Sequence, residues 1–319
     1  MNTTSADLPL PAGAVRLDDW GVIHATGADA RSFLNGQLTQ ETLQLDADQA
    51  RLAGYCTPKG RLLASFVVWR RAEDDVLLAC SADVLPAVLK RLSMFVLRAQ
   101  CKLSDVSAQL PLWGLAGEAA RTALRTKASM PVWGHASVAG ADVIRLPDAA
   151  VNGTPVPRWL WAGASGFALA AVPALDADDW RWLEVTSGVP RVVGATVEQF
   201  VPQMVNLELV GGVDFQKGCY PGQEVVARSQ YRGTLKRRAQ VVSSPVALQP
   251  GQEVFHDADP GQPAGMVVLA GSLAGRHHAA LVELKLSALA GGSLHAGAAD
   301  GPLLTLAALP YAIPAEPAA

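Results

Sequence analysis

The stretch Asp214–Arg238 of this 319-residue chain reads DFQKGCYPGQEVVARSQYRGTLKRR. Its centre places a thiol, Cys219, between Lys217 and Tyr220 on a turn bracketed by two glycines. Glycine tolerates backbone angles that other residues avoid, and Pro221 fixes its own φ, so we expect a tight bend. The segment is therefore a poor candidate for a core strand.

Positive charge accumulates after this turn. Nearby cations favour the thiolate over the thiol, so one interpretation is a reactive, partly exposed Cys219 beside an anion-binding surface. The alternative is a small buried cysteine on an ordinary turn. Residues 225–227 are typical of either the start of a strand or a buried helical turn. The basic residues, with no acidic residue among them, are Arg228, Arg232, Lys236, Arg237 and Arg238.

The octapeptide KGCYPGQE at 217–224 resembles the K-G-C-[FY]-x-G-Q-E signature of the YgfZ family, folate-binding proteins of the wider aminomethyltransferase superfamily. The flanks at 206–213 and 226–237 also fit that family. The resemblance implies a tetrahydrofolate-binding factor that supports assembly or repair of iron-sulfur clusters in client enzymes, including those that thiolate tRNA. It also implies that Cys219 is the essential thiol, with Lys217 beside it as the second candidate catalytic residue.

Two tryptophans, Trp20 and Trp180, match the positions that contact folate in that family. An indole face offers a large stacking area to a flat pterin at little conformational cost. Arg228 and Arg232 are candidate partners for the carboxylates of a folate's glutamyl tail. The alternatives for these arginines are solvated surface charges or a tRNA phosphate contact across the basic patch 228–238.

The chain departs from the aminomethyltransferase pattern at two carboxylates. The run 59–65, around Ala64, lacks the aspartate that serves those enzymes in catalysis. Their pterin-binding glutamate falls on Thr186, and we expect Glu184, two residues earlier, to point elsewhere on a helix. The resemblance therefore implies a retained folate pocket without aminomethyl transfer. A folate-dependent aminomethyltransferase and a non-enzymatic tRNA-binding module remain the alternatives.

Composition limits the class of protein. Half of the residues are hydrophobic and 17% are charged, which is typical of a well-buried globular protein, and a net charge of −3 argues against bulk nucleic-acid binding. Four scattered cysteines without a CxxC pair predict neither a disulfide framework nor a metal site, and they favour the cytoplasm. The N-terminus lacks a secretory signal, and the most apolar window, 160–175, is too broken for a membrane span.

Hydrophobic periodicity predicts an α+β protein. Strands are expected at 20–25, 52–56, 62–70, 76–80, 113–115, 142–146, 159–161 and 166–172. Helices are expected at 29–35, at 81–97 with Ser81 as N-cap, at 118–125, and from Trp180 with Asp178 and Asp179 as caps. These elements predict an aminomethyltransferase-like folate-binding core of two α+β subdomains at 1–238, the first of them possibly discontinuous.

The pattern changes after residue 238. Short apolar strands follow one another between Gly/Pro turns, with little helical signal, which is the profile of a small β-barrel. We therefore expect a C-terminal barrel domain at 239–319. Its strands are predicted at 240–243, 253–256, 265–270, 279–286 and 303–309.

Overall fold

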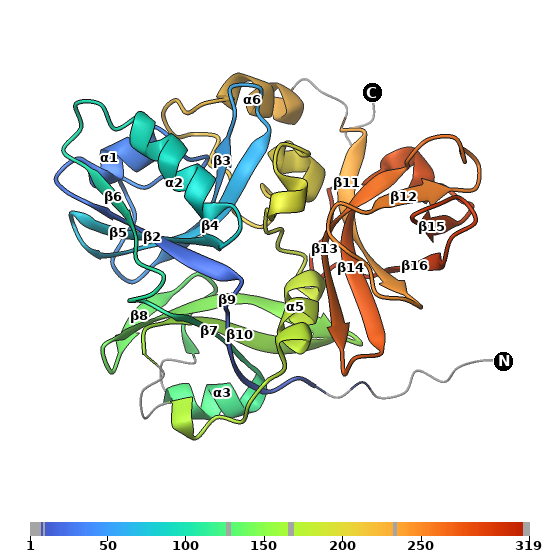
Figure 1. Cartoon of the computed structure of the whole chain (residues 1–319), viewed down its shortest axis with the longest axis horizontal. Helices are drawn as coiled ribbons and strands as arrows, with labels where there is room; N and C mark the ends of the chain where they lie inside the picture. The colour runs from blue at the N-terminus through green and yellow to red at the C-terminus, as the bar shows by residue number, and fades with distance from the viewer. Residues whose placement is uncertain (1–7, 9, 126–128, 165–168, 232–234, 315–319) are drawn as a thin grey trace.

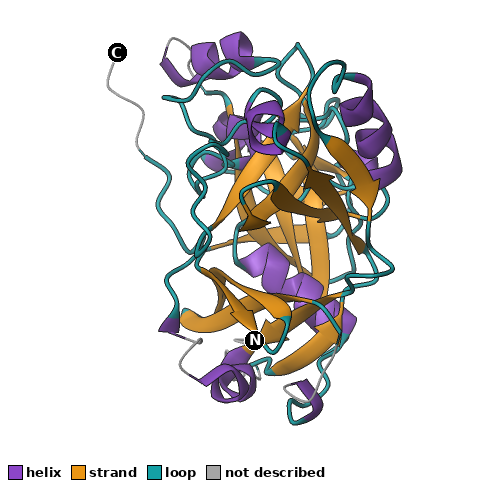
Figure 2. Cartoon of the chain, turned by 90° about the vertical axis from the view of Figure 1, so that its left-hand side faces the viewer, coloured by secondary structure: helices purple, strands orange, loops and turns teal. Residues whose placement is uncertain are grey.

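The computed structural model describes the whole chain except residues 1–7, 9, 126–128, 165–168, 232–234 and 315–319. Its described strands form two five-stranded antiparallel sheets and one closed barrel, which lie as three lobes around the helix α5 (Ala177–Thr186) (Figure 1). Most other helices lie at the periphery of the strands (Figure 2). The expected α+β core and C-terminal barrel are confirmed.

The first sheet has the strand order β3-β4-β5-β2-β6. Helices α1 (Ala30–Asn35) and α2 (Leu85–Met94) pack on one face, and the other face contributes to the central core shared by all three lobes. The first eight residues of β4 are buried, because both faces of this sheet are covered. The strands are β2 (Trp20–Thr26), β3 (Ala50–Cys56), β4 (Leu62–Ala72), β5 (Asp75–Ser81) and β6 (Lys102–Asp105).

The second sheet has the order β1-β7-β10-β9-β8. Helix α3 (Gly117–Leu124) packs on one face together with Trp159 and Trp161. The other face sends Leu146 and Leu160 into the central core. The strands are β1 (Gly13–Arg16), β7 (Leu112–Ala116), β8 (His135–Val138), β9 (Ala141–Val151) and β10 (Thr154–Ala162).

The barrel closes in the order β11-β14-β13-β12-β15-β16 around its own small core, which includes Val242, Val267 and Val282. The strands are β11 (Arg237–Ser244), β12 (Glu253–His256), β13 (Gly265–Leu273), β14 (His277–Lys285), β15 (Leu294–Ala296) and β16 (Leu303–Ala307). The remaining helices are η2 (Gly194–Thr196), η3 (Pro202–Val205), α6 (Gln223–Tyr231) and η4 (Leu286–Leu289). The first barrel strand begins at Arg237, and the division of the chain at residue 238 stays a prediction.

Helix α5 connects the lobes because both of its faces are buried. Residues two apart on a helix point to nearly opposite sides, and residues four apart share a side. Trp180 and Glu184 therefore face the two sheets, whereas Trp182 and Thr186 face the barrel. Gly271 of β13 allows this contact, since a Cβ built there would lie 2.3 Å from the backbone nitrogen of Trp182.

Several expected boundaries are wrong. Helix α2 begins at Leu85, and Ser81 belongs to β5 instead of capping the helix, because its strand pairing with Trp20 wins over its capping propensity. Asp176 is the N-cap of α5 and accepts a hydrogen bond from the amide of Asp178.

Other errors concern the existence or type of an element. The expected strand 166–172 is helical at residues 169–170, and its residues 166–168 lie outside the described part of the chain. Of the two alternatives for segment 225–227, the strand start is wrong and the helical turn is right, since the segment belongs to helix α6. The short strands β1, β6, β8 and β15 were not predicted, because three or four residues give too little alternation.

We predict that Gly271→Ala lowers the free energy of unfolding by about 1–3 kcal/mol, because the added methyl meets helix backbone that cannot rotate away. Urea unfolding measures this change. Gly261→Ala is the matched control: nothing lies within 4 Å of its built Cβ, so a change below about 0.5 kcal/mol is expected. Equal effects of the two substitutions would contradict the packing argument.

Candidate functional site

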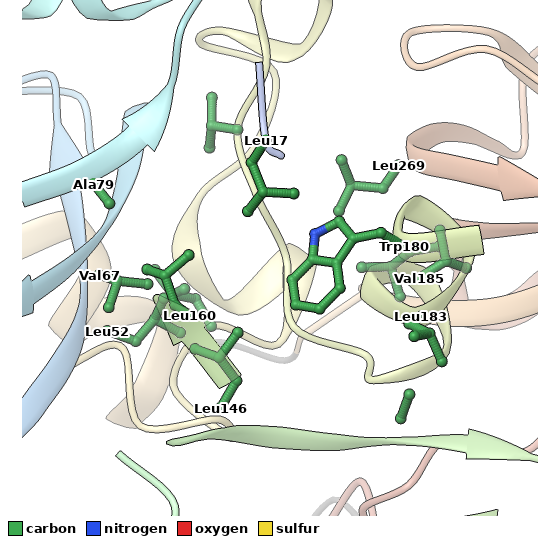
Figure 3. Packing of buried hydrophobic residues seen from close by; sticks show 14 of the residues in the cluster. Leu17, Leu52, Val67, Ala79, Leu146, Leu160, Trp180, Leu183, Val185 and Leu269 are labelled. Carbon is green, nitrogen blue, oxygen red and sulfur yellow. The ribbon is translucent and has the colours of Figure 1, made fainter. Parts of the chain in front are cut away.

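A small aromatic pocket lies where α5 meets the two sheets. Its volume is about 40 Å³, which holds about one or two water molecules. The indole of Trp180 projects from α5 toward Leu17 and the space between the sheets (Figure 3). The polar and aromatic residues of the lining are Trp20, Ser65, Trp133, Arg158, Trp180, Glu184, Ser187 and Arg191.

The position of Trp180 is fixed from two sides. Gly114 of β7 lies against the ring, and a Cβ built at Gly114 would come within 2.5 Å of it. The guanidinium carbon of Arg158 lies 5.4 Å from the ring centroid. Arg158 donates to the carbonyl of Pro147 through Nε and Nη2, and burial lowers the pKa of its guanidinium to about 10. The indole therefore presents a rigid surface to the pocket.

Both candidate tryptophans line this pocket, and both carry an unused donor. Among the described residues, no acceptor lies within hydrogen-bond distance of the buried indole N–H of Trp20 or of Trp180. A buried N–H without a partner costs free energy that a ligand acceptor would recover. The pair is thus suited to a flat ligand that brings its own acceptors.

The carboxylate of the pocket belongs to Glu184. Arg191 donates to it through two parallel hydrogen bonds, Nε to Oε1 at 3.0 Å and Nη2 to Oε2 at 3.1 Å. Arg191 also donates to Asp19 at 3.0 Å and to the hydroxyl of Ser81 at 2.9 Å. Burial raises the pKa of the Glu184 carboxyl, and Arg191 opposes that rise.

Glu184 does point away from Thr186, as expected, but the pocket lies on the side of Glu184, so the expectation that the pocket lacks this carboxylate is wrong. It follows Trp180 by four residues and therefore shares its face of α5, whereas Thr186 follows Trp182 and lies beside the barrel. The Thr186 hydroxyl donates to the carbonyl of Trp182 at 3.1 Å. The helical phase counted from Trp180 was the signal in the sequence that would have identified Glu184.

A wider groove adjoins the pocket. Its volume is about 590 Å³, and Leu52 and Trp133 line both spaces. Asp214, Phe215 and Gln216, which precede the cysteine turn, form one of its walls. Tyr231 of α6 completes this wall with its ring edge against Phe215, centroids 5.8 Å apart. The cysteine segment thus borders the approach to the aromatic pocket.

Cys219 is exposed on this segment. The buried ammonium of Lys217 anchors the turn, donating to the carbonyls of Asn35 at 2.5 Å and Leu38 at 3.0 Å. Burial lowers the pKa of Lys217, against the opposing charges of Glu41, Asp214 and Cys219. Lys217 therefore holds the loop against the end of α1.

Of the two bracketing glycines, only Gly222 needs to be glycine. It has a φ of +83°, and a Cβ there would lie 2.4 Å from the carbonyl oxygen of Thr57 in the β3–β4 turn. Gly218 has open space around its built Cβ and no positive φ. The turn is therefore held by close approach to the first sheet at one end and by Lys217 at the other.

The basic residues after the turn separate into two groups. Arg237 pairs with Glu283 of the barrel at 2.8 Å, and the buried Arg238 pairs with Glu208. Arg228 and Lys236 are exposed, and Arg232 lies outside the described residues. Arg238 thus links the barrel to the core, whereas the Arg237 pair lies within the barrel between β11 and β14. With these two cations paired, the basic surface is smaller than the sequence indicated.

The structure therefore places the predicted residues at three sites. Trp20 and Trp180 meet in the pocket, Lys217 and Cys219 lie on the loop that follows the groove wall, and Arg228 is exposed on α6. Sequence reasoning did not assign Trp133, Arg158 or Arg191 to the pocket, because no local pattern brings the turn before β8, strand β10 and the segment after α5 together.

The described residues offer neither a cluster of metal-binding side chains nor a membrane-spanning helix. They contain no cluster of three or more histidine, cysteine, aspartate or glutamate side chains placed to bind a metal ion. None of the described helices has the length and apolar character that crossing a membrane requires.

Comparison with known proteins shows a matching domain family and relatives of similar sequence. The GCVT N-terminal domain family matches residues 12–167. The tRNA-modifying protein YgfZ of Edwardsiella ictaluri (strain 93-146) is 36% identical over 72% of this chain and 70% of its own length. That of Vibrio vulnificus (strain CMCP6) is 33% identical over 75% and 72%.

A solved structure shares the fold. The glycine cleavage system aminomethyltransferase T from Bartonella henselae superposes with a TM-score of 0.75 at 15% identity, covering 95% of this chain and 87% of that one. The expected aminomethyltransferase-like fold is confirmed by this likeness.

We predict that iodoacetamide modifies Cys219 of the folded protein first, because Cys56 and Cys80 are buried and burial raises the pKa of each thiol to about 12. Mass spectrometry of peptides after short labelling at pH 8 measures the order. Labelling in urea is the control and should make all the thiols accessible. Modification of Cys56 or Cys80 as fast as Cys219 would contradict the described burial.

We also predict that Lys217→Met lowers the free energy of unfolding by about 1–3 kcal/mol, since the carbonyls of Asn35 and Leu38 lose their donor. Lys236→Met, at an exposed position, should change it by less than about 0.5 kcal/mol. Urea unfolding of both variants is the measurement. A Lys217→Met protein as stable as the wild type would show that the ammonium does not anchor the turn.

Proposed function

The chain belongs to the YgfZ family, and we propose that it binds a reduced folate in the aromatic pocket and supports tRNA modification through Cys219. In this proposal it serves the assembly or repair of iron-sulfur clusters in client enzymes, including those that thiolate tRNA. The observation that carries the proposal is the meeting of Trp20 and Trp180, both with unused N–H donors, beside the buried carboxylate of Glu184. The similar proteins from Edwardsiella ictaluri and Vibrio vulnificus are named tRNA-modifying proteins, which supports the link to tRNA modification.

The residues of the pocket fit a pterin in their chemistry. Indole faces stack on flat heteroaromatic rings, the two N–H groups need acceptors, and a carboxylate accepts paired N–H donors. The cavity of about 40 Å³ is smaller than a two-ring pterin, so side chains that line it must move before the ring fits. The groove of about 590 Å³ beside it has room for the remainder of a folate.

A bound tetrahydrofolate would supply a carrier for one-carbon groups. This chain's residues provide stacking from Trp20 and Trp180 and an acceptor in Glu184. The exposed Arg228, three residues before Tyr231 of the groove wall on α6, is our candidate for a carboxylate of the glutamyl tail, and Arg232 stays a prediction.

Cys219 serves as the exposed thiol of the proposal. Its turn is anchored by Lys217 and Gly222, and the thiol is exposed on the segment that follows the groove wall. An exposed thiol in that position is accessible to a client protein. Lys217 acts as a positioning residue, because its ammonium is bonded to backbone carbonyls.

We predict that Cys219→Ser abolishes support of tRNA modification while folate binding stays at the wild-type level. The first measurement is the methylthio-modified adenosine content of tRNA in a bacterial strain that lacks its own family member and expresses the variant. The second is calorimetric titration of the purified variant with 5-formyltetrahydrofolate. Full modification with Cys219→Ser would remove the thiol from the proposal.

We predict that Trp20→Leu has the opposite effect: it weakens folate binding and leaves the Cys219 thiol intact. Loss of one stacking face should weaken folate binding about tenfold, while Cys219 stays accessible to iodoacetamide. If the wild-type protein fails to bind reduced folate, the folate part of the proposal is wrong. Turnover in a glycine-cleavage assay would instead favour the aminomethyltransferase alternative.

A further inference from the structure

We infer that Arg191 is an internal occupant of the pocket that must be released before a flat ligand binds. The inference rests on the proposed folate function and adds a gate to it. Arg191 lies at the boundary of two cavities, since it lines both the aromatic pocket and a larger cleft of about 600 Å³ between the core and the barrel. Glu184 is the other charged residue that lines both spaces.

The contacts of Arg191 imitate those of a ring edge. The pyrimidinone edge of a pterin presents parallel N–H groups, and a guanidinium presents them in the same fork arrangement. Arg191 directs this fork at Glu184, with both N–O distances near the hydrogen-bond optimum at 3.0 and 3.1 Å. A ligand that uses Glu184 therefore competes with Arg191 for the same two oxygens.

The same side chain also covers the stacking surface. The guanidinium carbon of Arg191 lies 4.8 Å from the centroid of the Trp20 ring. Planar guanidinium groups stack on indoles as flat rings do. One residue thus occupies both the acceptor and an aromatic face that a ligand would need, which accounts for the small free volume of the pocket.

A released Arg191 side chain can turn into the cleft between the core and the barrel. The cleft that it also lines carries the carboxylates of Asp19, Asp83 and Asp178. Asp178 is already paired with Arg181 at 2.6 Å and Asp83 accepts from the amide of Gly194, so Asp19 is the main partner for a turned Arg191. Asp19 already accepts from Arg191 Nη2 at 3.0 Å, so the guanidinium can turn about this contact without losing every partner. Arg158, on the pocket side, is placed to compensate the charge of Glu184, and each affects the pKa of the other.

A gate of this kind lowers the apparent affinity, because only the fraction of molecules with Arg191 turned away binds ligand. Removing the gate should raise both the affinity and the association rate. The observed association rate of the wild type should level off at high ligand concentration, at the rate of Arg191 release. A variant without the gate should show a linear increase.

The test measures binding of 5-formyltetrahydrofolate to the full chain by stopped-flow tryptophan fluorescence and calorimetry. We expect about tenfold tighter and faster binding for Arg191→Gln. Because that change leaves Glu184 buried without its partner, Arg191→Lys is the second variant: it keeps the charge but cannot supply the planar fork. Near-ultraviolet circular dichroism establishes that each variant is folded.

Arg145→Gln is the matched control. Arg145 is a buried arginine that also stacks on an indole, 4.9 Å from the Trp159 ring centroid, and also pairs with a carboxylate, but it does not line the pocket. We expect wild-type binding kinetics from it. Equal acceleration in Arg145→Gln would overturn the gate, because general loosening would then explain the effect.

The remaining outcomes separate the two proposals. If the wild type binds and folded Arg191 variants bind no faster, the gate is wrong and the folate proposal stands. If neither the wild type nor the Arg191 variants bind, the folate proposal fails and the gate fails with it. Binding by the Arg191 variants alone would support both and would show that the closed state dominates in the wild type.

Discussion

The burial of both faces of helix α5 is the constraint on which the rest of the structure depends. A ten-residue helix offers little surface, yet this one places Trp180 against the two sheets and Trp182 against the barrel. Glycines make both contacts possible, Gly114 under one indole and Gly271 beside the helix backbone. The central core that results draws residues from all three lobes, so the pocket is formed by the assembly of the lobes and belongs to none of them alone.

The sequence allowed the fold class and every barrel strand except β15 to be predicted, because these depend on local patterns. Alternation located β2, β4, β5 and β12, and helical spacing located α2 and α3 to within a few residues. The resemblance around Cys219 predicted the family, and the comparisons confirm it. Local patterns did not predict the shortest strands or the capping residues, because tertiary contacts override the local propensity of these residues.

For the candidate site, prediction succeeded in part. Trp20 and Trp180 could be paired from resemblance alone, and they do line one pocket. The error over Glu184 came from aligning a motif letter by letter instead of following the helix from Trp180. Arg191 could not be found from the sequence, because its partners are Glu184, Asp19 and Ser81, which lie on three different segments. Long-range contacts of this kind are invisible to periodicity.

The docking of Trp182 against the barrel bears on how far this architecture is modular. The closed barrel has its own small core and looks like a separable unit. Yet the outer faces of its strands supply Leu269, Leu273 and Leu281 to the central core. A chain that ended before β11 would expose the barrel-facing side of α5 to water. The opposite side of the same short helix carries Trp180 and Glu184, so the pocket would lose its support. Recombination that exchanges the barrel must therefore preserve the outward-facing residues that contact the central core. The barrel and helix α5 are expected to be inherited together, although the barrel is closed on itself.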